Sequence, residues 1–178
     1  PPCWIDEDRQ WSNLGVPYEI DGVIGVRKKL TIEAGTTLQF QHGSGIKIED
    51  FDSALVAMGT STQPIIFTGV EETPGFWNGL YFLNTNETGS TTARSRLHHT
   101  VVEFGGGELH LDSNAEEFRG NIMLDGSGYN IAVEVQDSII RKSSGYGIWL
   151  DCLAHLTNTN NTFAENPSGD IGQEKDCN

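Results

Sequence analysis

The sequence has few basic residues: 11 Lys and Arg stand against 25 Asp and Glu, which gives a formal net charge of −14. Nucleic acids and anionic membrane surfaces are bound through clustered Lys and Arg side chains. The basic run at residues 27–29 is short and is typical of a solvated turn between strands. The chain also lacks the ~18 consecutive apolar residues of a membrane-spanning helix. We therefore expect no nucleic-acid partner and no membrane span.

Cysteine is also scarce, and Cys3, Cys152 and Cys177 have no C-x-x-C spacing. This spacing argues against a zinc knuckle or a dithiol redox motif. An odd number of cysteines allows at most one internal bridge. We expect Cys152 to pair with Cys177, which would fix the C-terminal tail to the last repeat and leave Cys3 free or paired between chains. Such a disulfide indicates an exported, oxidising setting.

Common catalytic motifs are missing as well. The sequence has no Gly-x-Ser-x-Gly motif, no phosphate-binding loop and no paired nucleophile and base. His98 and His99 are adjacent, so on a strand their rings would point to opposite faces and could not share a metal ion. The triplet Gly105–Gly107 is not followed by a helix pattern and therefore indicates a turn. These absences favour a protein without enzymatic activity.

Glycine, by contrast, is plentiful, with 21 residues that lie between short apolar segments. Residues 133–150, VEVQDSIIRKSSGYGIWL, show the pattern best, because three apolar segments alternate there with polar or glycine-containing corners. Each segment is too short for a helix and is typical of a strand with one face inward. Three strands and three bends in so few residues predict one turn of a wound sheet.

The same unit repeats along the chain. A Gly-[Ile/Leu]-x-[Ile/Phe/Leu] anchor recurs at Gly45, Gly79 and Gly147, with an imperfect copy at Gly120. Extra residues between the repeats are concentrated in three stretches, as loops are in solenoids: 69–77, 84–95 and 105–120. A β-sandwich is the alternative, but it would need hairpin turns throughout, whereas parallel strands added one per coil need none.

We therefore predict an all-β parallel β-helix of about five coils, in which Ile46, Leu80 and Ile148 stack on one another. The length suits a single domain with a substantial core. Residues 1–16 are expected to form an N-terminal cap, with Trp4 and Trp11 shielding the first coil. Residues 17–171 would form the coils, and residues 172–178 a C-terminal tail.

Three segments within Leu30–Phe82 resemble the right-handed parallel β-helix proteins of the pectate-lyase-like superfamily, which are exported bacterial proteins: LTIEAGTTLQF, SALVAMGTSTQPIIFTG and WNGLYF. The segment PYEIDG at 17–22 is similar to the usual entry of that fold. From residue 96 to 171 only the looser coil pattern persists. The resemblance implies a right-handed stack of three parallel sheets and secretion or display at a bacterial surface. It carries over no catalytic residue.

Aligning the anchors places four side chains in one outward column: Lys47, Tyr81, Met123 and Trp149. Roughly two positions further on, with the register open by one residue, the alignment gives Glu49, Asn84, Asp125 and Asp151. Adjacent coils lie ~4.8 Å apart, so Asp125 and Asp151 would be near neighbours.

This column is the candidate functional site, a shallow carbohydrate-binding strip. Tyr81 and Trp149 would stack on sugar C–H faces with Met123 between them, and Asp125 and Asp151 would bind hydroxyl groups or a calcium ion. The alternative is that these residues are an ordinary outer column of a solenoid.

We expect an exported, non-catalytic β-helical module for surface adhesion or glycan binding, with a glycan or cell-surface component as partner. The alternative is a small polysaccharide lyase or glycoside hydrolase that acts on an acidic polysaccharide. A lyase needs a cation and a base, and a hydrolase needs paired carboxylates. Lys47, the basic residue of the column, would lie two coils from the acid pair, which argues against catalysis. A structural repeat of a larger protein is the third hypothesis. No cofactor is expected, with calcium as the open alternative.

Overall fold

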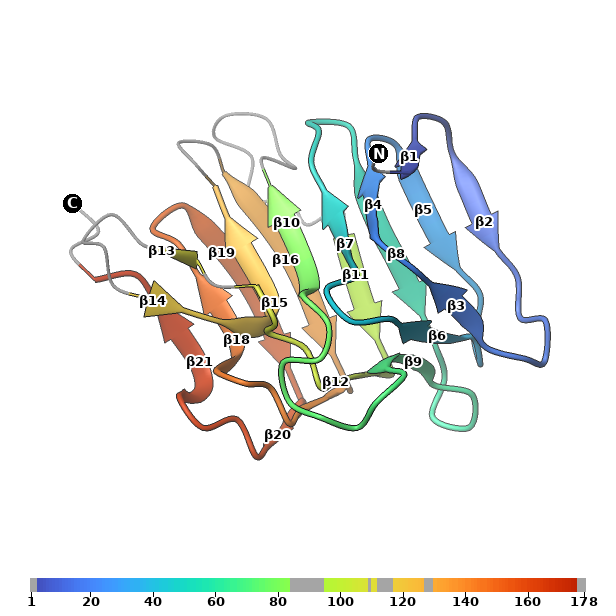
Figure 1. Ribbon diagram of the computed structural model, residues 1–178. Helices are drawn as coiled ribbons and strands as arrows, with labels where there is room; N and C mark the ends of the chain where they lie inside the picture. Colours follow the sequence, from blue (N-terminus) through green and yellow to red (C-terminus); the bar gives the residue numbers. More distant parts are fainter. Residues whose placement is uncertain (1–2, 84–94, 109, 112–116, 127–129, 176–178) are drawn as a thin grey trace.

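The computed structural model describes residues 3–83, 95–108, 110–111, 117–126 and 130–175. Within these ranges the chain forms strands, turns and loops, and no helix. Most strands belong to three sheets, and their colours in Figure 1 run from blue at one end of the molecule to red at the other. The chain therefore winds along one axis, and each coil lies beside the next.

The three sheets are named here sheet A, sheet B and sheet C. Sheet A has seven strands, in the order β1 (Cys3–Ile5), β4 (Val23–Val26), β7 (Gly45–Ile48), β10 (Gly79–Leu83), β15 (Gly120–Asp125), β18 (Tyr146–Leu150) and β21 (Gly169–Gln173). Sheet B has six, in the order β2 (Arg9–Trp11), β5 (Lys29–Ile32), β8 (Ala54–Met58), β11 (Ser95–His98), β16 (Ile131–Gln136) and β19 (Ala154–Thr159). Sheet C also has six, in the order β3 (Tyr18–Ile20), β6 (Thr37–Phe40), β9 (Ile65–Gly69), β12 (Thr100–Glu103), β17 (Ile139–Arg141) and β20 (Thr162–Ala164).

Every neighbouring pair within these sheets is parallel, and each strand pairs with the equivalent strand of the next coil. Leu80 is paired with Ile46 on one side and with Ile122 on the other, and Ile122 is paired in turn with Ile148. All four side chains are fully buried in one core. The predicted right-handed parallel β-helix and its interior column are confirmed, and the sandwich alternative is wrong.

The winding begins earlier than residue 17. Within the segment expected to be a cap, β1 pairs with β4 and β2 pairs with β5, so these strands belong to a first coil that β3 completes. Trp11 packs against the core and stacks on Tyr18, with ring centroids 5.4 Å apart. Trp4 instead lies on the outer face over Gly25, under the guanidinium of Arg27. Only one of the two tryptophans therefore shields the interior.

Buried polar side chains bind the backbone where one sheet turns into the next. Asn121 accepts a hydrogen bond from the backbone N–H of Gly105 at 2.7 Å and donates to the carbonyls of Val102 and Arg141. The Ser138 hydroxyl accepts a hydrogen bond from the backbone N–H of Thr100 at 3.0 Å. Because buried backbone groups need partners, these side chains allow sharp corners without unpaired groups.

Cys3 is exposed and free. The disulfide predicted between Cys152 and Cys177 stays a prediction, because Cys177 lies outside the described residues. Among the described residues no helix has the length and hydropathy that crossing a bilayer requires.

Candidate functional site

The outward column on sheet A is in the predicted register. Tyr81 is paired with Lys47 and with Met123, and Met123 is paired with Trp149. The second row needs one correction: Leu83, not Asn84, is the residue opposite Asp125, and Asn84 lies outside the described residues. Asn84 is three positions after Tyr81, whereas the other members of the row are two positions after their column residues, so the row was out of register by one residue there.

A small hairpin covers this column. Its strands are β13 (His110–Leu111) and β14 (Glu117–Phe118), which are antiparallel and pair with each other. In Figure 1 they lie outside sheet A near β15, β18 and β21. The Phe118 ring stacks on Trp149 with centroids 3.6 Å apart and planes 5° apart. Trp149 is consequently only 5% exposed and Met123 only 1%.

The hairpin extends the aromatic contacts to Tyr81. The ring of His110 lies 4.7 Å from that of Tyr81 and 5.6 Å from that of Phe118. Burial lowers the pKa of His110, while the nearby Glu108 opposes this shift. Glu108 also pairs with Lys47 at 3.5 Å. The strip predicted from the sequence is therefore a second, smaller apolar cluster on the outside of the solenoid, and not a bare surface.

Tyr81 and Asp125 are joined directly. The Tyr81 hydroxyl donates a hydrogen bond of 2.5 Å to Asp125 Oδ2. Burial and this bond to a carboxylate both raise the pKa of Tyr81 above its ordinary value. The phenol therefore stays protonated and donates this hydrogen bond. It occupies one oxygen of Asp125, a carboxylate that we had expected to bind a ligand.

The Asp151 carboxylate accepts hydrogen bonds from two backbone segments. The donors are the N–H of Gly126 at 2.5 Å and the N–H of Leu153 at 2.9 Å. Burial raises the pKa of Asp151, although these two bonds oppose the shift, and Asp125 raises it further. No group of three or more His, Cys, Asp or Glu residues suited to a metal ion occurs in the described part of the chain.

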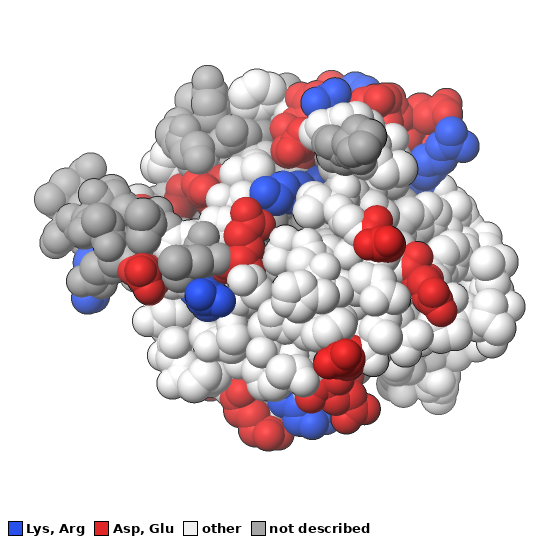
Figure 2. Space-filling model, in the orientation of Figure 1, with Lys and Arg blue, Asp and Glu red and all other residues white. Residues whose placement is uncertain are grey.

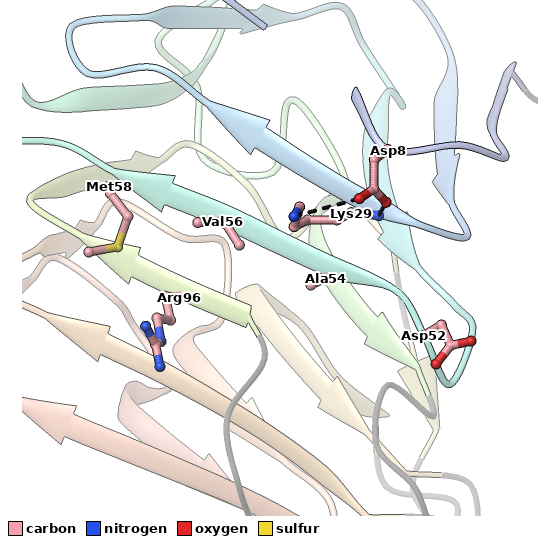
Figure 3. A pocket seen from close by; sticks show the side chains of 7 residues that line it. All are labelled: Asp8, Lys29, Asp52, Ala54, Val56, Met58 and Arg96. Atoms are coloured by element: carbon pink, nitrogen blue, oxygen red, sulfur yellow. Dashed lines mark hydrogen bonds and ion pairs between the residues drawn. The ribbon is translucent and has the colours of Figure 1, made fainter. Parts of the chain in front are cut away.

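An open groove lies on sheet B, away from the covered column (Figure 3). Its volume is about 430 Å³, which falls in the range of small-ligand sites. The floor comes from β8, where Ala54, Val56 and Met58 point outward, and Met58 is 41% exposed. Lys29 and Arg96, from the strands on either side, are longer, so they stand above this floor.

Each cation of the groove has an acidic partner. Lys29 Nζ lies 3.6 Å from Asp8 Oδ2, and Arg96 Nε lies 3.8 Å from Glu134 Oε2. The other oxygen of Glu134 is 2.6 Å from His98 Nε2. The next histidine, His99, is directed to a different carboxylate, that of Asp137 at 4.0 Å. The groove thus combines an apolar floor with donors and acceptors on both rims.

The sequence did not indicate this groove. Its shape depends on short side chains on one strand between long side chains on strands from two other coils. The hydrophobic pattern of a single strand predicts which residues point inward and which point outward. It does not predict how far an outward side chain projects relative to its neighbours on adjacent strands. The available signal was the small outward Ala54 and Val56, between Lys29 and Arg96 in aligned coils.

Charged side chains of both signs are mixed on the surface. Figure 2 shows acidic and basic groups at the upper and lower margins of one face, with further charged groups scattered between them. Most of the described basic side chains have acidic neighbours, as Arg27 does with Asp6 and Glu49. The described residues of this face form no broad basic patch of the kind that a nucleic acid needs. In comparisons with known proteins, no family model, curated protein or solved structure matches the chain.

Proposed function

We propose that this chain is an exported, non-catalytic β-helical module of the pectate-lyase-like type that binds a neutral glycan in the groove of sheet B. The groove of Ala54, Val56 and Met58 between two charged rims is the observation that carries the proposal. Export and display at a bacterial surface belong to the same proposal and derive from the resemblance of Leu30–Phe82.

The chemistry of the groove suits a sugar. The apolar floor can take the C–H face of a pyranose ring, and the pairs Lys29–Asp8 and Arg96–Glu134 offer donors and acceptors to its hydroxyl groups. A neutral glycan is favoured because both cations are already paired with carboxylates and the chain carries a net charge of −14. An anionic polymer would be repelled by this excess.

The alternative function, a lyase or hydrolase acting on an acidic polysaccharide, has less support. Asp125 binds the Tyr81 hydroxyl, and both oxygens of Asp151 bind backbone N–H groups. A carboxylate that acts as a catalytic acid or base must reach the substrate, and these two are occupied by the protein. Incubation with polygalacturonate and calcium, followed by ultraviolet absorbance of unsaturated products, tests this alternative. Turnover that disappears in Asp125→Asn or Asp151→Asn would establish it.

Calorimetric titration with neutral hexasaccharides (cellohexaose, xylohexaose and mannohexaose) tests the proposed function. We expect the wild type to bind at least one of them, and Val56→Asp and Arg96→Ala to weaken that binding at least tenfold. Ile139→Ala is the matched control, because Ile139 points outward on sheet C, away from the groove. Failure of the wild type to bind any of the three sugars, or unchanged binding in both groove variants, would contradict the proposal.

A further inference from the structure

The hairpin of β13 and β14 is attached to the solenoid in an unusual way. Its two described strands hydrogen bond to each other and are not members of sheet A, B or C. The described contacts of these strands with sheet A are made by side chains: Phe118 on Trp149, His110 against Tyr81, and Glu108 with Lys47. Backbone hydrogen bonds to the coils begin at the flanking residues, where Arg119 accepts from the N–H of Tyr146. The contacts are therefore separable from the parallel ladders that define the coils.

The solenoid core does not include the hairpin. Phe118, Met123 and Trp149 form a cluster of their own, and Tyr81 and Tyr146 pack against it. The coil also closes beneath the hairpin. A Cβ at Gly106 would lie 3.4 Å from the backbone nitrogen of Gly120, so the chain leaves and returns at nearly the same place. Displacing the hairpin would leave the interior packing intact.

Phe118 lies where a flat ligand would lie. The Phe118 and Trp149 rings, with centroids 3.6 Å and planes 5° apart, are in face-to-face contact. A flat apolar C–H face of similar size could occupy the same place on Trp149. Tyr81 and Trp149 lie two strands apart in the same column, with Met123 between them. The hairpin thus covers the strip where successive sugar units could stack.

We propose that the strip of Tyr81, Met123 and Trp149 is a second glycan-binding surface, which the protein occupies with its own Phe118 as an autoinhibitory contact. This inference rests on the proposed glycan-binding function but concerns another face of the molecule. The ligand class is an unbranched neutral oligosaccharide with flat C–H faces.

Removing the Phe118 ring tests the contact. We expect Phe118→Ala to bind cellohexaose, xylohexaose or mannohexaose at least tenfold more tightly than the wild type, measured by calorimetry. The gain should vanish in Phe118→Ala/Trp149→Ala. Phe118→Leu is the matched control, because it keeps an apolar cover over Trp149 and should gain much less. Trp149 fluorescence should shift to the red in Phe118→Ala before sugar is added and back to the blue afterwards.

A second variant replaces residues 108–118 with two glycines, which the closeness of Gly106 and Gly120 permits. It should retain the strand-rich circular dichroism spectrum and show the same gain. The inference would be overturned if the folded variants bound no hexasaccharide more tightly than the wild type does. A gain in affinity that survives Trp149→Ala would overturn it as well, and so would failure of both variants to fold.

The groove and the strip are distinguished by repeating the titrations with Arg96→Ala present. If Phe118→Ala still increases the affinity for the sugar when Arg96→Ala is present, the strip is supported even where the groove does not bind. Loss of all binding on Arg96→Ala, with no effect of Phe118→Ala, supports the groove alone and contradicts the strip.

Discussion

The ring of Trp77 lies parallel to that of Phe40, with centroids 4.1 Å apart and planes 7° apart. Trp77 comes from the stretch between β9 and β10, yet it is fully buried. Its Nε1–H donates to the carbonyl of Glu103 at 2.8 Å. A loop residue therefore forms part of the core, and its indole is bonded as well as packed.

Truncation of Trp77 should be among the most damaging single changes. We expect Trp77→Ala to lower the free energy of unfolding by about 3–5 kcal/mol, because it removes a large buried ring and leaves a cavity. Chemical denaturation followed by circular dichroism measures this. Trp4→Ala is the control, since Trp4 is 37% exposed on the outer face, and it should cost far less. Equal losses in the two variants would contradict the assignment of Trp77 to the core.

Adjacent isoleucines on β17 provide a matched pair. Ile140 is fully buried, whereas Ile139 is 38% exposed. Ile140→Ala should cost ~2–5 kcal/mol of unfolding free energy, as should truncation of the equally buried Ile148. Ile139→Ala should change it by no more than about 0.5 kcal/mol, as most surface substitutions do. Denaturant titrations of the three variants would reject the register if Ile139 proved the more sensitive residue.

Asn121 should matter for its hydrogen bonds more than for its size. Its side chain is buried and binds three backbone groups at the corner below the hairpin. Asn121→Ala leaves those groups without partners, and each unsatisfied buried group costs about 1–3 kcal/mol. We expect a clear fall in the thermal midpoint, and only a small one for Asn158→Ala, whose residue is exposed. A tolerant Asn121→Ala would mean that water replaces the amide.

Asp151 should make stability depend on pH. Its folded-state pKa is raised by burial, so the folded protein holds this proton more tightly than the unfolded chain does. The stabilising contribution is fully present below the ordinary aspartate pKa and is lost as pH rises through the raised value. Unfolding free energies across the mildly acidic range should therefore change less steeply in Asp151→Asn than in the wild type. Identical slopes in Asp151→Asn and the wild type would refute the prediction.

The predicted Cys152–Cys177 bridge can be counted chemically. Thiol titration of the denatured protein should find one reactive thiol per chain, that of Cys3, before reduction and three afterwards. The protein must come from an oxidising compartment, because the bridge forms only there. Three thiols before reduction would show that the bridge is absent.

The repeating part of the fold was predictable because it is local. Gly45 and Gly79 begin strands of sheet A and Gly147 is the second residue of another, and the residue after each glycine points into the core. This fixed the register of Tyr81, Met123 and Trp149. Cys3–Trp11 was missed because its two strands have only three residues each, too few to show a period.

The surface was less predictable, because it depends on loops and on neighbours from other coils. Trp77 looked like a loop residue, since nothing in its local sequence shows that the chain turns inward there. Phe118 carried a faint signal, as an apolar residue in a long excursion opposite an outward Trp149. A column with Met123 and Trp149 facing outward implies a cover, but the sequence does not show which segment supplies it.

Each strand of the three sheets pairs only with strands of the coil before and the coil after it. Tension applied along the winding axis should therefore peel the outermost layers away singly, and heat should fray both extremities before the middle. We therefore expect the central strands β7 to β10 to be the last to separate.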